Sequence, residues 1–254
     1  MNEYSDYVAI QVKNREIFCL NYAPDIRTFA SLLSELRSSW TRLGTTRDAT
    51  GRSHAGLLLF SNILIRHAIF GFEHLASYQS FLTWLTFRPG LEALLIIGKF
   101  VDDPANAGIW KARQSDFKTY NRTFSGTALE SRSLPRSADF RQVLARLNDD
   151  FMHPNPYFTY RDTTVTEEGD AAVVEIEFFD KSAEVHEGHL LAYVNLIDLV
   201  VSASDALVSS ICGSAGTPSP REEYSKREHA RATRLAAQNS TAKKVMEELG
   251  LWSF

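Results

Sequence analysis

Three chemically distinct side chains share one stripe of the segment 137–152: Arg146, Asp150 and His153. At about 100° per residue, a helix places them within roughly 60° of one another, beside its apolar face. An imidazole suits general acid–base catalysis, a guanidinium stabilises charge on a phosphate, and a carboxylate can orient either group. We therefore interpret these three residues as candidate catalytic residues. The alternative is an i,i+4 surface ion pair followed by a histidine at a helix C-terminus.

A second stripe lies in the segment 89–101 and at its start. Arg88, Glu92 and Lys99 are spaced i, i+4, i+11, and the helix that carries them is otherwise nearly all apolar. A buried charge without a partner is costly, so this stripe should face either a cleft or charged partners. We assign the three residues as candidate substrate-binding residues. The alternative is a structural ion pair across a bundle.

Histidines provide a third hypothesis. His67 and His74 are seven residues apart on one helix face, and with His153 they could supply three imidazoles to a metal-dependent hydrolase. A further His/carboxylate cluster, expected to be exposed, begins the last long helix: Glu184, His186, Glu187 and His189. Histidines that form hydrogen bonds at the edge of a core are the commoner case. We therefore predict no metal and no cofactor.

The elements that must position these residues follow from the apolar periodicity. Steps of three and four predict helices, whereas alternation predicts strands. We predict a mainly α fold, an up-and-down helical bundle with a β-hairpin inserted before the last core helix and peripheral C-terminal helices. The predicted helices are 25–43, 55–86, 89–101, 105–122, 137–152 and 186–212, and the strands are 157–166 and 171–179.

The domain organisation follows from the same pattern. Residues 1–24 form an N-terminal segment with a short hairpin at about 7–20, residues 25–212 form the bundle with its hairpin at about 157–179, and residues 213–254 form a linker and a helical tail. The most apolar segments are interrupted by polar or charged residues, so we predict core helices and no membrane contact. A cytoplasmic location is the simplest expectation for a chain with two isolated cysteines and no signal peptide.

Charge is unevenly distributed along the 254 residues. The whole chain carries a formal net charge of −4, yet residues 24–153 carry +4 and residues 154–220 carry −9. Thirteen of the sixteen cations in 24–153 are arginines, whose planar fork suits phosphate or carboxylate. The overall acidity therefore excludes a uniformly basic nucleic-acid binder, and it leaves room for an anionic ligand at the arginine-rich body.

An arginine followed closely by a histidine at the end of a bundle helix resembles the HEPN families. Here the motif runs Arg146-Leu-Asn-Asp-Asp-Phe-Met-His153. The chain is also similar to an uncharacterised bacterial HEPN-like branch, with Arg88 and Glu92 on a central helix and a later His153-Pro154. The resemblance covers roughly residues 25–212. One departure is Leu147, where many active members carry a polar residue.

The resemblance implies a bundle of four to five helices, often a homodimer, with the Arg/His site in a cleft near the dimer interface. Active members cut RNA without a metal, which implies an RNA-cleaving or nucleotide-acting enzyme in stress or phage defence. In that role His153 is the general acid/base, Arg146 stabilises the phosphate charge and Asp150 orients one of them. Many HEPN-like domains serve binding alone, so the alternative is a catalytically silent helical module that binds a protein partner or itself.

Overall fold

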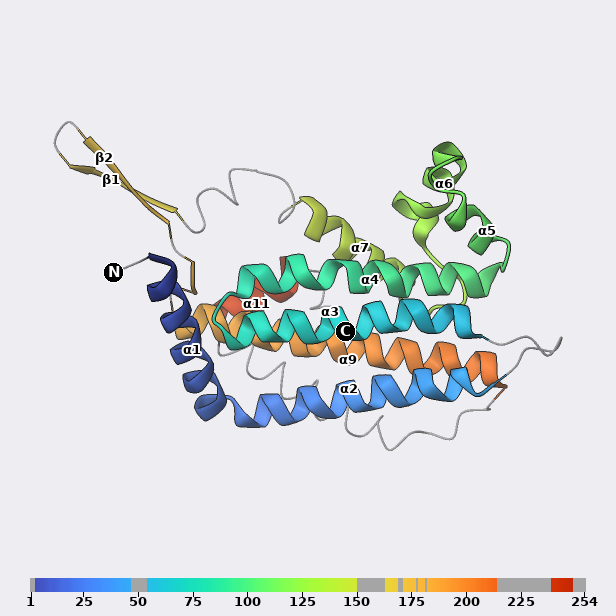
Figure 1. The fold of residues 1–254 in the computed structure, drawn as a ribbon, viewed down its shortest axis with the longest axis horizontal. Helices are drawn as coiled ribbons and strands as arrows, with labels where there is room; N and C mark the ends of the chain where they lie inside the picture. The colour runs from blue at the N-terminus through green and yellow to red at the C-terminus, as the bar shows by residue number, and fades with distance from the viewer. Residues whose placement is uncertain are drawn as a thin grey trace.

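A bundle of long helices forms the body of the protein in the computed structural model, which describes residues 3–46, 54–149, 163–168, 171–176, 178–180, 182–213 and 239–248. The bundle helices run side by side along the long axis of the molecule (Figure 1). They are α2 (Ala23–Gly44), α3 (Ala55–Ala76), α4 (Ser80–Asp102) and α9 (Ala183–Cys212). The prediction of a mainly α helical bundle is confirmed at this level.

Helix α2 shows why the apolar periodicity predicted helices well. Its buried apolar residues are spaced by three or four positions: Phe29, Leu32, Leu36, Trp40 and Leu43. This spacing gathers them on one stripe, which packs chiefly against α9. The opposite stripe of α2 is polar and exposed, as expected of an amphipathic helix.

The boundary between α3 and α4 differs from the prediction. The chain turns at residues 77–79, where Tyr78 adopts a left-handed φ of 58° and the Gln79 N–H donates to the His74 carbonyl at 2.9 Å. Pro89 can open a new helix or lie within a longer one, and in the structure it lies inside the continuous helix α4. A proline inside a helix removes one backbone hydrogen bond, and close packing can compensate for that loss.

Helix α3 packs closely on the turn of α4 that contains Pro89. A Cβ atom on Gly90 would lie 3.1 Å from the His67 Cβ and 3.3 Å from the Leu64 carbonyl oxygen, so the residue after Pro89 has no room for a side chain. The Thr86 carbonyl oxygen, three residues before Pro89, lies 2.6 Å from the Nδ1 of His67. An imidazole from α3 therefore contacts a backbone carbonyl in the turn of α4 that precedes the proline.

The predicted N-terminal hairpin is wrong, because Glu3–Asn21 form helix α1 across one end of the bundle (Figure 1). Tertiary contacts hold it there. Phe18 is buried against Phe72, and Arg15 forms a 2.9 Å ion pair with Glu73. The β-branched residues that suggested strands remain largely exposed on the helix, so local propensity was outweighed by these contacts.

Shorter elements cover α4 and the far side of the bundle. They are α5 (Asn106–Lys111), α6 (Phe117–Phe124), the 3-10 helix η1 (Gly126–Leu129), α7 (Ser137–Leu147) and α11 (Ser240–Glu248). The helix predicted over 105–122 is divided in two, because Asp116 accepts a hydrogen bond from the Thr119 N–H at 3.0 Å and caps α6. Helix α7 packs on α4, and α11 packs on α9.

Two strands lie in the segment before α9. Strand β1 (Thr163–Glu168) pairs with β2 (Ala171–Ile176) in antiparallel register, from Thr163 opposite Ile176 to Glu168 opposite Ala171. They stand away from the bundle, at the same end as α1 (Figure 1). The start of the first predicted strand lies outside the described residues.

The predictions of no membrane contact and of a cytoplasmic location are overturned by three of the bundle helices. The segments Gly56–Ala76, Ser80–Asp102 and Ala183–Cys212 each contain a stretch of 18 residues with a mean hydropathy of 1.3, 1.3 and 1.6 respectively, and each is long and apolar enough to cross a membrane. About 20 residues of helix span a bilayer core. The polar residues that we took as exclusions are too few and too widely spaced to exclude it, because such side chains are tolerated where protein groups partner them. Length and composition thus indicate a candidate membrane protein.

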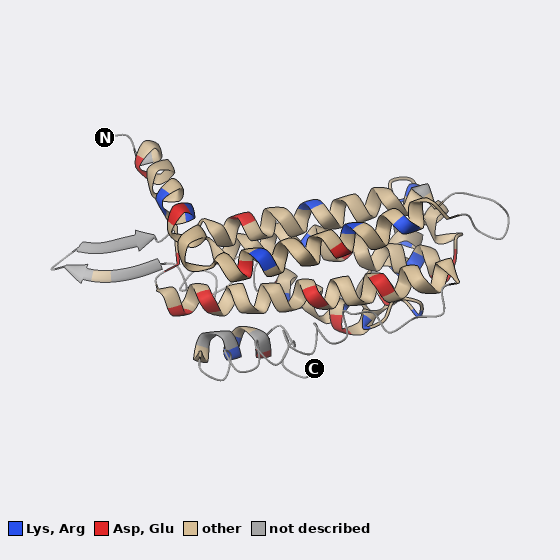
Figure 2. Cartoon of the chain, turned by 90° about the horizontal axis from the view of Figure 1, so that it is seen from below, with Lys and Arg blue, Asp and Glu red and all other residues tan. Residues whose placement is uncertain are grey.

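Helix α9 contains four acidic residues, Glu184, Glu187, Asp198 and Asp205, and no lysine or arginine. Acidic and basic residues are coloured along the helices in Figure 2. Asp205 accepts hydrogen bonds from the Ser39 hydroxyl at 2.9 Å and from Arg42 at 3.1 Å, both on α2. Asp205, in the acidic stretch 154–220, is therefore paired with a cation of the same chain, Arg42.

Candidate functional site

The stripe on α4 meets the end of α7. Arg88 forms a 3.3 Å ion pair with Glu92 one turn further along α4, and its Nε donates a hydrogen bond to the side-chain oxygen of Asn148. The Arg88 and Glu92 side chains are 26% and 33% exposed to solvent, so a ligand could reach both. Two of the five N–H donors of Arg88 are used in these contacts. The structure thus joins the arginine–glutamate pair to a residue sixty positions later in the chain.

Lys99 does not join this pair. Eleven residues separate it from Arg88, which corresponds to about 16 Å along the helix axis. Its Nζ lies 3.4 Å from the Glu130 carbonyl oxygen, at the C-terminal end of α4. The two ends of the predicted substrate-binding stripe therefore lie at separate places on one helix face.

The stripe on α7 is described only in part. Arg146 donates from its Nη1 to the Glu247 carbonyl at 2.8 Å, near the C-terminus of α11. Because Asn148 is two residues further along, Arg146 and Asn148 point to different sides of the chain. Arg146 thus meets α11, whereas Asn148 meets Arg88. Asp150 and His153 lie outside the described residues.

The metal hypothesis finds no support at His67, whose Nδ1 faces the Thr86 carbonyl. In the part of the chain that the structure describes, no group of three or more His, Cys, Asp or Glu side chains could hold a metal ion. His153, the third member of that hypothesis, lies outside the described residues.

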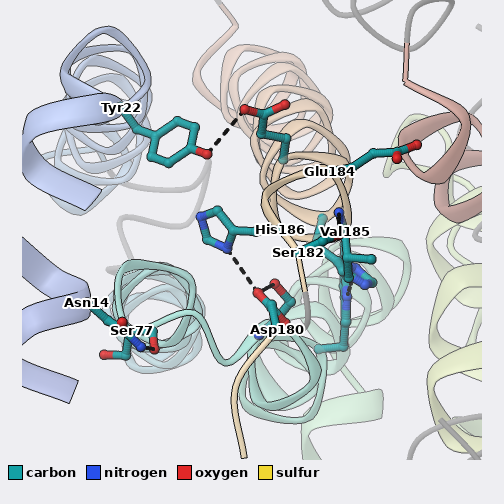
Figure 3. A network of polar contacts seen from close by, with 12 residues as sticks. Asn14, Tyr22, Ser77, Asp180, Ser182, Glu184, Val185 and His186 are labelled. Atoms are coloured by element: carbon teal, nitrogen blue, oxygen red, sulfur yellow. Dashed lines mark hydrogen bonds and ion pairs between the residues drawn. The ribbon is translucent and has the colours of Figure 1, made fainter. Parts of the chain in front are cut away.

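A buried polar network at the α1 end of the bundle was not predicted (Figure 3). His186 has no exposed surface, and its Nδ1 lies 2.9 Å from Asp180 Oδ2. The same carboxylate accepts hydrogen bonds from Ser80, from the backbone N–H at 3.2 Å and from the hydroxyl at 2.6 Å. Asp180 in turn donates its own N–H to the Tyr78 carbonyl at 2.7 Å. One carboxylate therefore ties the start of α4 to the start of α9.

Aromatic rings close around the imidazole of His186. Tyr78 stacks on it at 4.0 Å between ring centroids, and Phe18 and Tyr22 approach edge-on at 5.7 and 5.3 Å. The Tyr22 hydroxyl also donates to Glu187 at 3.2 Å. Burial, the Glu187 carboxylate and the neighbouring Tyr78 raise the pKa of Tyr22 far above its ordinary value. Burial likewise raises the pKa of Tyr78.

An imidazole held by a carboxylate is the arrangement that orients a general base in many enzymes. Here the Nε2 of His186 is buried and has no hydrogen-bond partner among the described residues, and the rings of Phe18 and Tyr22 cover the residue. A substrate could not reach that atom, so the network holds α1, α4 and α9 together. The expectation that the cluster of Glu184, His186, Glu187 and His189 is exposed holds for the two glutamates. It is wrong for the histidines, since His186 is fully buried and His189 is 3% exposed.

A sequence signal for this burial was present. His186, His189 and Tyr193 follow one another by steps of three and four, in phase with the buried apolar stripe of α9. In the structure His189 accepts a hydrogen bond from Trp84 Nε1 at 3.0 Å, which satisfies both side chains inside the core. The spacing of these histidines therefore indicated the buried face of α9, although polar side chains at a helix start suggested the surface.

Comparison with models of protein families, with curated proteins and with solved structures found no match to this chain.

Proposed function

We propose that this chain is an HEPN-like protein that cleaves RNA without a metal ion, at the junction of α4 and α7. The observation that carries the proposal is the hydrogen bond from Arg88 to Asn148. It brings the Arg88–Glu92 pair to the segment that continues to His153, five residues after Asn148 in the sequence. This contact supports a single site for the two motifs on which the resemblance rests, although the Arg146 side chain itself meets α11.

The chemistry follows from the residue types. His153 would take the proton from a ribose 2′-hydroxyl as its oxygen attacks the adjacent phosphorus, and an imidazolium would return a proton to the departing 5′-oxygen. Negative charge develops on the phosphate oxygens in that step. Arg88 keeps N–H donors beyond its described contacts, and these donors suit that charge. The resemblance gives the same role to Arg146, whose side chain meets α11 and not Arg88, so the variant Arg146→Ala tests that role separately. Asp150 would orient His153 or one of the arginines.

A cleavage assay tests the proposal. Single-stranded RNA labelled at one end is incubated with the wild type, His153→Ala, Arg146→Ala and Arg88→Ala, all in the presence of EDTA. We expect wild-type cleavage to persist in EDTA and His153→Ala to lose about 10²–10⁴-fold in rate, which is the usual size of a general acid–base contribution.

Two controls make the assay specific. Arg122→Ala removes an arginine from the exposed surface of α6 and should leave the rate unchanged. A substrate with 2′-deoxyribose throughout has no nucleophile and should not be cut. Equal residual rates in the wild type and in all the variants would contradict the catalytic assignment.

The second candidate function is a catalytically silent helical module. It is favoured by apolar side chains that α1 leaves on its surface, with Ile10 44%, Val12 55% and Leu20 82% exposed. Large apolar side chains that stay exposed on a helix are candidates for contact with another protein. This function predicts no RNA cleavage by the wild type, together with a self-associated state that Val12→Asp and Leu20→Asp weaken in analytical ultracentrifugation.

A further inference from the structure

A polar cavity of about 470 Å³ lies at the C-terminal end of α4, about three helical turns from Arg88. We call it the α4-end cavity. Elements from three parts of the chain build it: the end of α4, the start of α5, and η1 with the loop after it. Its lining residues are Lys99, Asp102, Asp103, Asn106, Thr127, Ala128, Glu130 and Arg132.

The wall of the cavity is fixed by close packing. A Cβ atom on Gly98 would lie 2.7 Å from the Cβ of Ser131 and 2.9 Å from that of Leu134, so the loop lies directly on the α4 backbone. The Ser131 N–H donates to the Ser137 hydroxyl at 2.7 Å, and the Ser131 hydroxyl accepts from the Leu134 N–H at 3.1 Å. A loop held in this way presents its side chains in one arrangement.

The acidic side chains of the cavity already have donors. Asp102 accepts the backbone N–H groups of Arg132 and Ser133, at 2.9 and 2.8 Å. Asp103 accepts the N–H of Ala105 at 2.9 Å. Glu130 forms an ion pair with Arg141 at 2.5 Å. Each carboxylate therefore has a structural partner, and no described group of acids forms a cation site.

Most N–H groups of the two cationic side chains, Lys99 and Arg132, have no hydrogen-bond partner among the described residues. Lys99 makes one long contact of 3.4 Å, with the Glu130 carbonyl. Within the described residues, the exposed Arg132 guanidinium has neither a hydrogen-bond partner nor an ion-pair partner. An ammonium and a guanidinium with spare N–H groups on one cavity are a pair that binds phosphate oxygens, the guanidinium in a bidentate manner.

We propose that the α4-end cavity binds the phosphate group of a small phosphate monoester, between Lys99 and Arg132. Its volume lies within the range of small-molecule sites and exceeds what a bare phosphate needs. Among the described residues, the lining contains no aromatic ring on which a base could stack, and it offers Thr127 and Asn106 instead. A polar, non-aromatic body such as a sugar fits this lining. The inference does not depend on RNA cleavage, because its test measures binding alone.

Isothermal titration calorimetry at constant ionic strength tests the proposal. The probes are inorganic phosphate, ribose 5-phosphate and ribose. We expect saturable binding of both phosphates, with ribose 5-phosphate the tighter, and no binding of ribose. In Lys99→Gln/Arg132→Gln we expect the affinity to fall at least about tenfold, because two charge-assisted contacts are lost.

The matched control is Lys111→Gln/Arg122→Gln, which removes the same charge from exposed positions outside the cavity and should bind as the wild type does. Circular dichroism confirms that each variant folds. Three results would overturn the proposal: equal binding of ribose and ribose 5-phosphate, unchanged affinity in the cavity variant, or an equal loss in the control variant. Saturable binding of Ca²⁺ without binding of phosphate would overturn it as well.

Discussion

The Arg88 guanidinium on α4 donates a hydrogen bond to the Asn148 side chain just beyond α7, across sixty residues of sequence. Both residues are only partly exposed, and Arg88 also pairs with Glu92. This contact links the central helix of the bundle to the end of α7, whose Arg146 begins the Arg-x6-His motif of the sequence. Its strength can be measured separately from any catalytic role.

A double-mutant cycle on Arg88→Ala and Asn148→Ala should give a coupling free energy of about 1 kcal/mol, the usual net value of such a hydrogen bond. The measurement is the free energy of unfolding in urea. Arg88→Ala combined with Asp139→Ala serves as the reference cycle, because those two side chains share no described contact. A coupling no larger than that of the reference cycle would show that the contact does not form in solution.

Removing the carboxylate of the buried network should be costly. We expect Asp180→Ala to lower the free energy of unfolding by about 3 kcal/mol, since the imidazole of His186 and two donors of Ser80 would lose their acceptor. Thermal or urea unfolding measures the loss. The control is Asp139→Ala, which breaks a surface pair with Arg136 and should cost less than about 1 kcal/mol. Equal losses in the two variants would contradict the buried network.

We expect the free energy of unfolding to decrease at alkaline pH because of the Tyr22 hydroxyl. Its pKa in the folded state is raised above the ordinary value of 10.0, so the folded state keeps a proton that the unfolded chain releases. The stability contributed by this group is therefore complete below about pH 10 and decreases as the pH rises above it. We expect Tyr22→Phe to lose stability less steeply than the wild type in urea unfolding between about pH 9 and 11.

Tyr4→Phe provides the comparison, because Tyr4 is 71% exposed. Its stability should follow the wild-type curve over the same range of pH. If Tyr22→Phe also follows that curve, the raised pKa of Tyr22 is contradicted.

Two glycines of α3 should respond in opposite ways to the same substitution. A Cβ atom on Gly71 would overlap the hydroxyl of the fully buried Tyr193, which donates to the Ala68 carbonyl at 2.7 Å. Gly71→Ala should therefore cost about 1–3 kcal/mol of stability through overpacking. Gly56 has open space around it, so Gly56→Ala should leave stability unchanged or raise it by less than about 1 kcal/mol. Thermal unfolding distinguishes the two, and a stable Gly71→Ala protein would contradict the packing.

The sequence by itself determined the helices whose apolar residues follow a clear period. Phe29, Leu32 and Leu36 illustrate this, since spacing by three and four positions fixes which side of a helix is buried whatever it packs against. The same local rule placed Arg88 and Glu92 on one helix face, but it did not predict that they form an ion pair with each other.

Only the tertiary structure decided which partners these faces meet. Residues 3–21 are helical because Phe18 and Arg15 contact α3, and nothing in their own pattern specified that neighbour. His186 is buried because Asp180 and three rings surround it, although a histidine beside two glutamates suggests the surface. Lys99 and Arg132 line one cavity because the loop after η1 folds onto the end of α4. Local spacing sets the direction of a side chain on its own element, whereas long-range packing sets its partner and its exposure.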